Sequence, residues 1–170
     1  MYVPKEIESI NRDSSLSQNP LYFTAHLPLY PVLIRRISPL FGYLKSMLVI
    51  IIFFTGLLAT FFYYFLKKFN LTKHPLLIAS IFLFLPRFLV VRSVGAPESL
   101  FLFLVLTSLF FFEKEKYLLA GLLGGLSVIT KTPGLILFAA YGFVFLERFI
   151  KTKKIKLSWA WILLIPAGFF

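Results

Sequence analysis

A run of 21 uncharged residues, 46–66 (SMLVIIIFFTGLLATFFYYFL), constrains this chain more than any other feature. About 20 consecutive apolar residues in a helix are enough to cross the hydrocarbon core of a bilayer. The composition agrees, because 59% of the 170 residues are hydrophobic and 22 residues are Phe. A soluble domain of this length has too little interior to bury so much aromatic surface. The sequence therefore predicts an integral membrane protein.

Further apolar runs come after the first, and short polar segments separate them. They cover residues 76–91, 98–112, 117–130 and 134–146, and a last one begins at residue 157. This pattern predicts an all-α, polytopic transmembrane helix bundle with about five to six membrane helices. Several runs are short, since a helix of about 15 residues rises only ~22 Å against a hydrocarbon core of ~30 Å. Short helices of this kind suit a protein whose loops line a water-accessible space.

The residues before the first long run differ from the rest. We divide the chain into an outer-face loop with a short interfacial helix, residues 1–45, and a transmembrane helical domain, residues 46–170, truncated at its C-terminus. Prolines are expected to prevent one regular helix over the end of the first part; they are Pro28, Pro31 and Pro39. The apolar residues among them still predict a short amphipathic piece at the membrane surface; they are Leu29, Val32, Leu33, Ile37 and Leu40.

Positive charge sets the expected orientation. The chain has 18 Lys and Arg against 7 Asp and Glu, and most of the basic residues lie in the gaps 67–75, 113–116 and 147–156. The positive-inside rule puts these gaps on the cytoplasmic side. The N-terminal part and the gaps near residues 92–98 and 131–133 then share the outer face. Nucleic acid is excluded as a partner, because no basic patch with interleaved aromatic residues lies outside the apolar runs.

The outer face gathers the polar candidates for a functional site. They are His26, Tyr30, Arg35, Arg36, Arg92, Glu98 and Lys131, with Arg87 in the neighbouring apolar run. Glu98 follows Pro97, which suits a helix-start acid paired with Arg92 and equally a polar group that lines a substrate site. Lys131 is either a lysine that extends to headgroups or a cation for the phosphate of a lipid-linked substrate. Arg87 is either interfacial or faces protein or water.

Metal and nucleotide sites have little support in the sequence. The two histidines, His26 and His74, fall on opposite faces, and there are no cysteines. No Gly-rich nucleotide loop follows a strand. No cofactor is therefore predicted with certainty, and a divalent metal is left open. Gly121, Gly124 and Gly125 lie within one helix and are interpreted as packing positions.

Ordered motifs between residues 25 and 145 resemble those of PIG-V-type mannosyltransferases in the GT-C superfamily. The segment AHLPLYPVLIRRIS, residues 25–38, is similar to the end of the first outer loop in that family. Residues 95–137 are similar to the part of those proteins that comes after this loop. There an acidic-Ser-Leu-Phe helix start, here at Glu98, leads through a charged turn to a threonine-basic-x-x-Gly turn, here Thr130 to Gly134.

The resemblance implies the GT-C fold and an integral membrane glycosyltransferase. Such enzymes transfer a hexose, mannose in the family this chain resembles, from a polyprenyl- or dolichyl-phosphate donor. The acceptor is a glycan, a lipid or a protein, and transfer takes place at the periplasmic, extracellular or ER-lumenal face of the lipid bilayer. The residues expected to bind donor or acceptor are His26, Tyr30, Arg87, Arg92, Glu98 and Lys131.

The catalytic acid is the main departure from the family. In that family it comes after a first membrane helix, whereas here the first long run starts only at residue 46. We therefore expect the chain to be a fragment whose catalytic acid lies upstream of Met1. Asp13 is the candidate within the chain, although the surrounding RDSS lacks the aromatic flanks of the family motif.

Two other functions stay open. A transporter or flippase for lipid-linked sugars predicts internal repeats and charged groups deep in several helices. The sequence shows only Arg87 of this kind and no repeat. A non-catalytic membrane subunit is the better interpretation if Met1 is the true start, because the expected acid is then missing.

Overall fold

A computed structural model describes residues 28–86, 96–153 and 157–168, and every regular element within these ranges is a helix. The predicted all-helical class is confirmed for them. The elements are α3 (Leu29–Phe41), α4 (Tyr43–Lys68), α5 (Pro75–Phe84), α7 (Glu98–Glu113), α8 (Tyr117–Thr130), the 3₁₀ helix η1 (Thr132–Leu135), α9 (Ile136–Thr152), the 3₁₀ helix η2 (Leu157–Leu163) and α10 (Leu164–Ala167).

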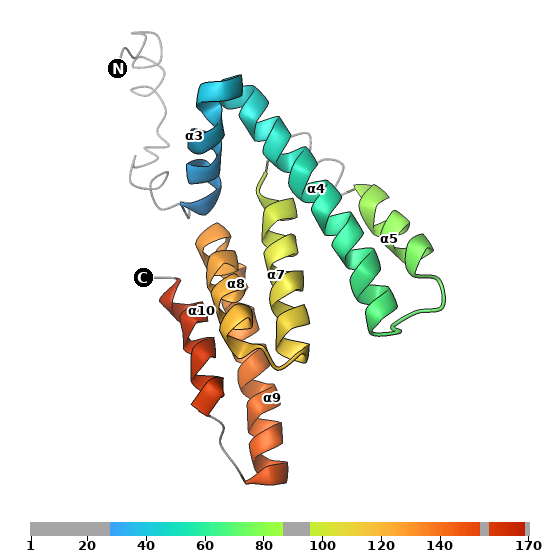
Figure 1. The fold of residues 1–170 in the computed structure, drawn as a ribbon, viewed down its shortest axis with the longest axis vertical. Coiled ribbons are helices and arrows are strands. Elements are labelled where there is room, and N and C mark those ends of the chain that lie inside the picture. The colour runs from blue at the N-terminus through green and yellow to red at the C-terminus, as the bar shows by residue number, and fades with distance from the viewer. Residues whose placement is uncertain (1–27, 87–95, 154–156, 169–170) are drawn as a thin grey trace, which may run out of the picture.

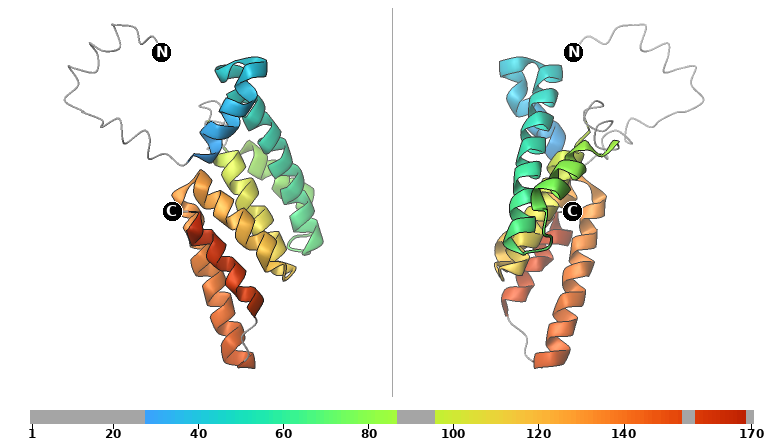
Figure 2. Two further views of the ribbon diagram at one scale, coloured as in Figure 1. Left: turned by 60° about the vertical axis from the view of Figure 1, so that its left-hand side comes forward. Right: turned by 90° about the vertical axis from the view of Figure 1, so that its right-hand side faces the viewer.

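The long helices run up and down beside one another, and α3 folds back along the first part of α4 (Figures 1 and 2). Gly42 joins α3 to α4 with φ at +76°, a conformation that glycine adopts without strain. The C-terminal ends of α4, α7 and α9 point to the same end of the molecule, the lower end in Figure 1. This direction agrees with the expectation that the three basic gaps share one side.

Helix α3 corrects the expectation that prolines would interrupt this part of the chain. Pro31 lies in the first turn, where backbone N–H groups have no partner within the helix, so its missing donor is not needed. Pro39 lies in the last turn and cannot donate to the Arg35 carbonyl. The Ser38 hydroxyl donates to that carbonyl instead, at 3.0 Å. The helix is therefore continuous over 13 residues.

The apolar residues predicted for this helix divide into two sets. Leu29, Leu33 and Ile37 pack against a core that includes residues of α4 and α7. Val32 and Leu40 are exposed instead. The helix is thus amphipathic, with its apolar stripe directed at the protein.

Two helical segments are long and apolar enough to span a membrane: α4, with 26 residues, and η1 together with α9, with 21 residues. Helices α7 and α8 follow their predicted runs closely, but their 16 and 14 residues rise only ~24 and ~21 Å. By length and composition the described residues support two spans. A bundle of five to six spans is not confirmed by them.

The predicted basic loop at residues 147–156 is wrong over its first part, because α9 continues to Thr152. Lys151 Nζ donates to Glu147 Oε1 at 2.6 Å, one helical turn away. Such i,i+4 pairs stabilise a helix end. Arg148 Nη1 donates to Tyr117 Oη at 2.7 Å and so ties the last part of α9 to the start of α8. The charges thus support the helix instead of ending it.

Helix α8 lies at the centre of the bundle and packs through its glycines. A Cβ atom at Gly124 would lie 2.8 Å from Ile165 Cγ1, and one at Gly125 would lie 2.7 Å from the Leu164 carbonyl oxygen. A Cβ at Gly121 would meet the Trp161 carbonyl in the same way. The interpretation of these glycines as packing positions is confirmed.

Helix α8 is also fixed by a buried hydrogen-bond network. The Ser108 hydroxyl of α7 lies 2.7 Å from the Ala120 carbonyl oxygen of α8 and 2.8 Å from Tyr141 Oη of α9. The Phe112 and Tyr141 rings stack with centroids 4.0 Å apart. These contacts hold α7, α8 and α9 in register near the start of α8, the end opposite Lys131.

Candidate functional site

The structure brings together three of the residues predicted from the sequence to form a site: Tyr30, Glu98 and Lys131. They come from α3, from the start of α7 and from the end of α8. Four other predicted residues lie outside the described part of the chain: Asp13, His26, Arg87 and Arg92. The expected pairing of Glu98 with Arg92 thus falls outside the described residues, among which Glu98 pairs with Lys131.

Glu98 is the first residue of α7, directly after Pro97. The Phe101 N–H donates to the Pro97 carbonyl at 2.9 Å and closes the first turn. A carboxylate in this turn is stabilised by the positive end of the helix dipole. The next residue, Ser99, is buried and its hydroxyl lies 2.8 Å from the Thr55 hydroxyl of α4. The start of α7, and Glu98 with it, is thus fixed against α4.

Lys131 lies in the short turn that joins α8 to η1. Its backbone is extended, its N–H donates to the Ser127 carbonyl at 2.9 Å, and its carbonyl accepts from the Gly134 N–H at 2.9 Å. A Cβ atom at Gly134 would lie 2.7 Å from Ser127 Oγ and 2.7 Å from the Val128 nitrogen. Only glycine lets η1 approach α8 this closely. The Thr-Lys-x-x-Gly pattern is therefore the sequence of a tight turn that presents Lys131.

The two charged side chains form an ion pair in which Lys131 Nζ donates to Glu98 Oε1. The Lys131 side chain is 34% exposed and the Glu98 side chain 24% exposed, so the surrounding protein encloses the pair only in part. The second carboxylate oxygen, Glu98 Oε2, is buried and has no hydrogen-bond partner within the described residues. One oxygen of the Glu98 carboxylate therefore has a hydrogen-bond partner, and the other has none among the described residues. A buried oxygen without a partner is uncommon and requires an explanation.

Tyr30 supplies a neutral hydroxyl close to the ion pair. The residue is 8% exposed and packs with Ile50, Ile51, Leu100 and Leu104. Burial first, and the negative charge of Glu98 second, raise the pKa of Tyr30 to about 12. The hydroxyl therefore keeps its proton at neutral pH and can donate it in a hydrogen bond.

The ion pair is level with the middle of α4 rather than with its end. Thr55, which contacts Ser99 beside Glu98, lies near the centre of the uncharged run 46–66. Further along, Phe61 contacts Phe103 and Phe69 contacts Phe110, both with ring centroids 5.9 Å apart, so α4 and α7 run in the same direction. The first part of α4 extends ~18 Å beyond the start of α7. Helix α3 packs beside this extension (Figure 1).

Residues 29–46, which form α3 and the start of α4, carry three basic residues and no acidic one. The hairpin that they form lies at the top of Figure 1. Arg35 and Arg36 of α3 and Lys45 at the start of α4 are exposed. The other acidic residues of the described ranges, Glu113, Glu115 and Glu147, are at the C-terminal ends of α7 and α9. Glu98 is therefore the one carboxylate of the described residues that lies away from the C-terminal ends of α7 and α9.

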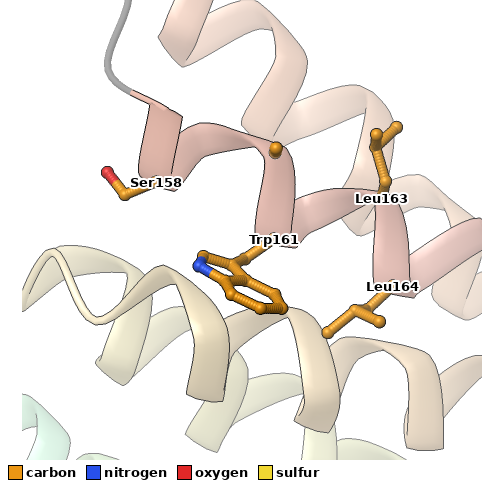
Figure 3. A pocket seen from close by; sticks show the side chains of 5 residues that line it. Ser158, Trp161, Leu163 and Leu164 are labelled. Atoms are coloured by element: carbon orange, nitrogen blue, oxygen red, sulfur yellow. The ribbon is translucent and has the colours of Figure 1, made fainter.

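One pocket of the described residues lies away from the ion pair. It has a volume of about 520 Å³ and is lined by Ser158, Ala160, Trp161, Leu163 and Leu164. Figure 3 shows Trp161 and Leu164 on one side of this segment and Leu163 on the other. The residues that line it carry no charge, so the pocket lacks a cation that would pair with a phosphate. Within the described ranges, no three histidine, aspartate or glutamate residues gather to hold a metal ion.

Sequence reasoning missed the hydroxyl pair that fixes the start of α7. Thr55 and Ser99 resemble any other hydroxyl residue in an apolar helix, and nothing in their flanks indicates that they meet. Their contact could be found only from the packing of α4 against α7. No protein-family model, curated protein or solved structure matches the chain. The ion pair and its surroundings therefore carry the functional argument together with the sequence motifs.

Proposed function

We propose that the chain is part of an integral membrane glycosyltransferase that takes a hexose from a polyprenyl- or dolichyl-phosphate donor at the outer face of the membrane. The observation that carries the proposal is the Glu98–Lys131 ion pair. Two motifs that resemble those of PIG-V-type mannosyltransferases, Glu-Ser-Leu-Phe and Thr-Lys-x-x-Gly, are far apart in the sequence and supply one partner each. Their meeting supports a shared site.

The residues of this site suit the chemistry of a lipid-phosphate donor. When the bond between the sugar and the phosphate breaks, negative charge increases on the leaving phosphate, and a fixed cation lowers the barrier. Lys131 is that cation. Beside Lys131, the Glu98 carboxylate is suited to accept a hydrogen bond from the hexose and the Tyr30 hydroxyl to donate one. The base that takes the proton of the acceptor hydroxyl is assigned to none of these residues.

The proposal includes a multi-pass topology with five to six membrane helices and with the start of α4 at the outer face. Because the chain has no cysteine, single cysteines report on this directly. Lys45→Cys and Lys73→Cys are a matched pair, since both lysines are exposed and they flank α4. In intact cells, an impermeant maleimide is expected to label position 45 and to label position 73 only after permeabilisation. Labelling of position 73 in intact cells would reverse the orientation.

A transfer assay tests the activity itself. Membranes that contain the full-length protein are supplied with radiolabelled polyprenyl-phosphate mannose or glucose, and incorporation of label into glycan, lipid and protein fractions is measured. We expect incorporation from one lipid-linked donor and none from the matching nucleotide sugar. Movement of the donor across the bilayer without transfer would favour a transporter. Absence of both would favour a non-catalytic subunit.

A further inference from the structure

We propose that Glu98 is the resident counter-ion of Lys131 and that a phosphate-bearing ligand displaces it. The inference rests on the proposed function, because it concerns how the same lysine receives a lipid phosphate. In the unliganded protein the carboxylate neutralises the ammonium group. When the ligand binds, its phosphate forms the ion pair with Lys131, and Glu98 is released to other partners.

The position of the pair explains why a resident counter-ion is needed. Thr55 and Ser99 set the start of α7 level with the centre of the uncharged run of α4. If α4 spans the bilayer, an unpaired ammonium at this level lies in a region where an isolated charge is costly. A carboxylate removes that cost while the site is empty. A phosphate anion removes it equally well, so the two anions compete for one cation.

The geometry of the pair favours exchange over a permanent tether. Lys131 Nζ contacts one acceptor among the described residues, Glu98 Oε1, although an ammonium group has three donors. Its side chain is one-third exposed, so a ligand can reach it. The carboxylate leaves its second oxygen, Oε2, buried without a partner among the described residues. A permanent ion pair is stable when the remaining donors and acceptors are also satisfied, and within the described part of the chain those of this pair are not.

The surrounding charge favours an anionic ligand over a cationic one. Exposed Arg35, Arg36 and Lys45 lie on the same helical hairpin that extends beyond the start of α7. The positive end of the α7 dipole adds to this potential. An approaching phosphate is therefore attracted toward Lys131, whereas the single carboxylate is the one group it must displace.

The test compares the binding of farnesyl phosphate, a short polyprenyl phosphate, to the full-length protein and its variants in detergent micelles. Farnesol, which lacks the phosphate, is the control ligand. Glu98→Gln is expected to bind farnesyl phosphate about tenfold more tightly than the wild type, because the competing anion is gone. Glu147→Gln removes the acidic partner of another ion pair and is expected to leave binding unchanged. Farnesol binding should not change in any variant.

The outcomes distinguish failure of this inference alone from failure of the proposed function. If the wild type binds farnesyl phosphate in preference to farnesol but Glu98→Gln binds it no more tightly, the pair is a structural tether and the counter-ion inference is wrong. If neither protein distinguishes the two ligands, the inference and the phosphate role in the proposed function both fail. Should Glu98→Gln not fold, Glu98→Asp shortens the carboxylate and is expected to strengthen binding by a smaller factor. Unchanged or weaker binding by that variant would also overturn the inference.

Discussion

Replacement of Lys131 by methionine is expected to lower sugar transfer by the full-length protein by about 100-fold or more, the size of effect seen when one fixed charge-stabilising donor is removed from an active site. Methionine keeps much of the length of the side chain and removes the charge. Under the proposed function, the leaving phosphate then lacks its cation, so the rate of transfer is expected to fall even when the donor is saturating. Initial rates from the lipid-linked donor measure the effect.

The controls for this variant separate charge from folding. Lys131→Arg keeps the positive charge and is expected to retain most of the activity. Lys73→Met removes an exposed lysine at the opposite end of α4 and should be fully active. Because Lys131→Met leaves Glu98 without its cation, the double variant Glu98→Gln with Lys131→Met restores a neutral pair. That double variant is expected to be stable and inactive, and wild-type transfer by it would exclude a phosphate role for Lys131.

Replacement of Gly125 by leucine is expected to lower the free energy of unfolding by about 3 kcal/mol or more, because a larger side chain must separate two closely packed segments. A single Cβ atom at this position already lies 2.7 Å from the Leu164 carbonyl oxygen. The backbone of α10 cannot move aside as a flexible side chain would. Unfolding in mixed micelles with increasing SDS, followed by circular dichroism, measures the change.

Gly142 provides the matched control for this substitution. It lies within α9, and a Cβ atom there would have no neighbour within 4 Å. Gly142→Leu is therefore expected to be neutral or to stabilise α9 by up to about 1 kcal/mol through helix propensity. Equal destabilisation by the two variants would show that the effect comes from the side chain in the membrane mimic and not from contact between α8 and α10.

The sequence predicted the ends of α7 and α8 well because both are marked by unambiguous residues. Pro97 and Glu98 start one helix, and the charged turn at 113–116 separates it from the next. The prediction for α3 was wrong because the positions of its two prolines allow a helix. Pro31 lies in the first turn, and the carbonyl left without a donor by Pro39 accepts a hydrogen bond from the Ser38 hydroxyl. The prediction for the end of α9 was wrong because charged residues that look like a loop are paired along the helix.

The sequence indicated which residues belong to the site, but not which of them contact one another. Glu98 and Lys131 stood out because each is a charge beside an apolar run, and the choice of partner depended on how α7 meets α8. The sequence offered Arg92 as an equally reasonable partner for Glu98. The position of the ion pair along α4 could not be predicted from the sequence either, because it depends on a contact between the Thr55 and Ser99 hydroxyls.

The close packing of α8 against α10 has a consequence for how the protein is made. Gly121, Gly124 and Gly125 leave the ribosome before the segment that covers them, since α9 must be synthesised in between. During that interval the narrow face of α8 is open to any other helix with small residues, and such faces associate readily in a bilayer. Correct assembly is therefore expected to require that residues 157–168 pack against α8 before another helix does. The glycines that allow close packing in the finished bundle thus also make its folding sensitive to the order in which the helices are synthesised.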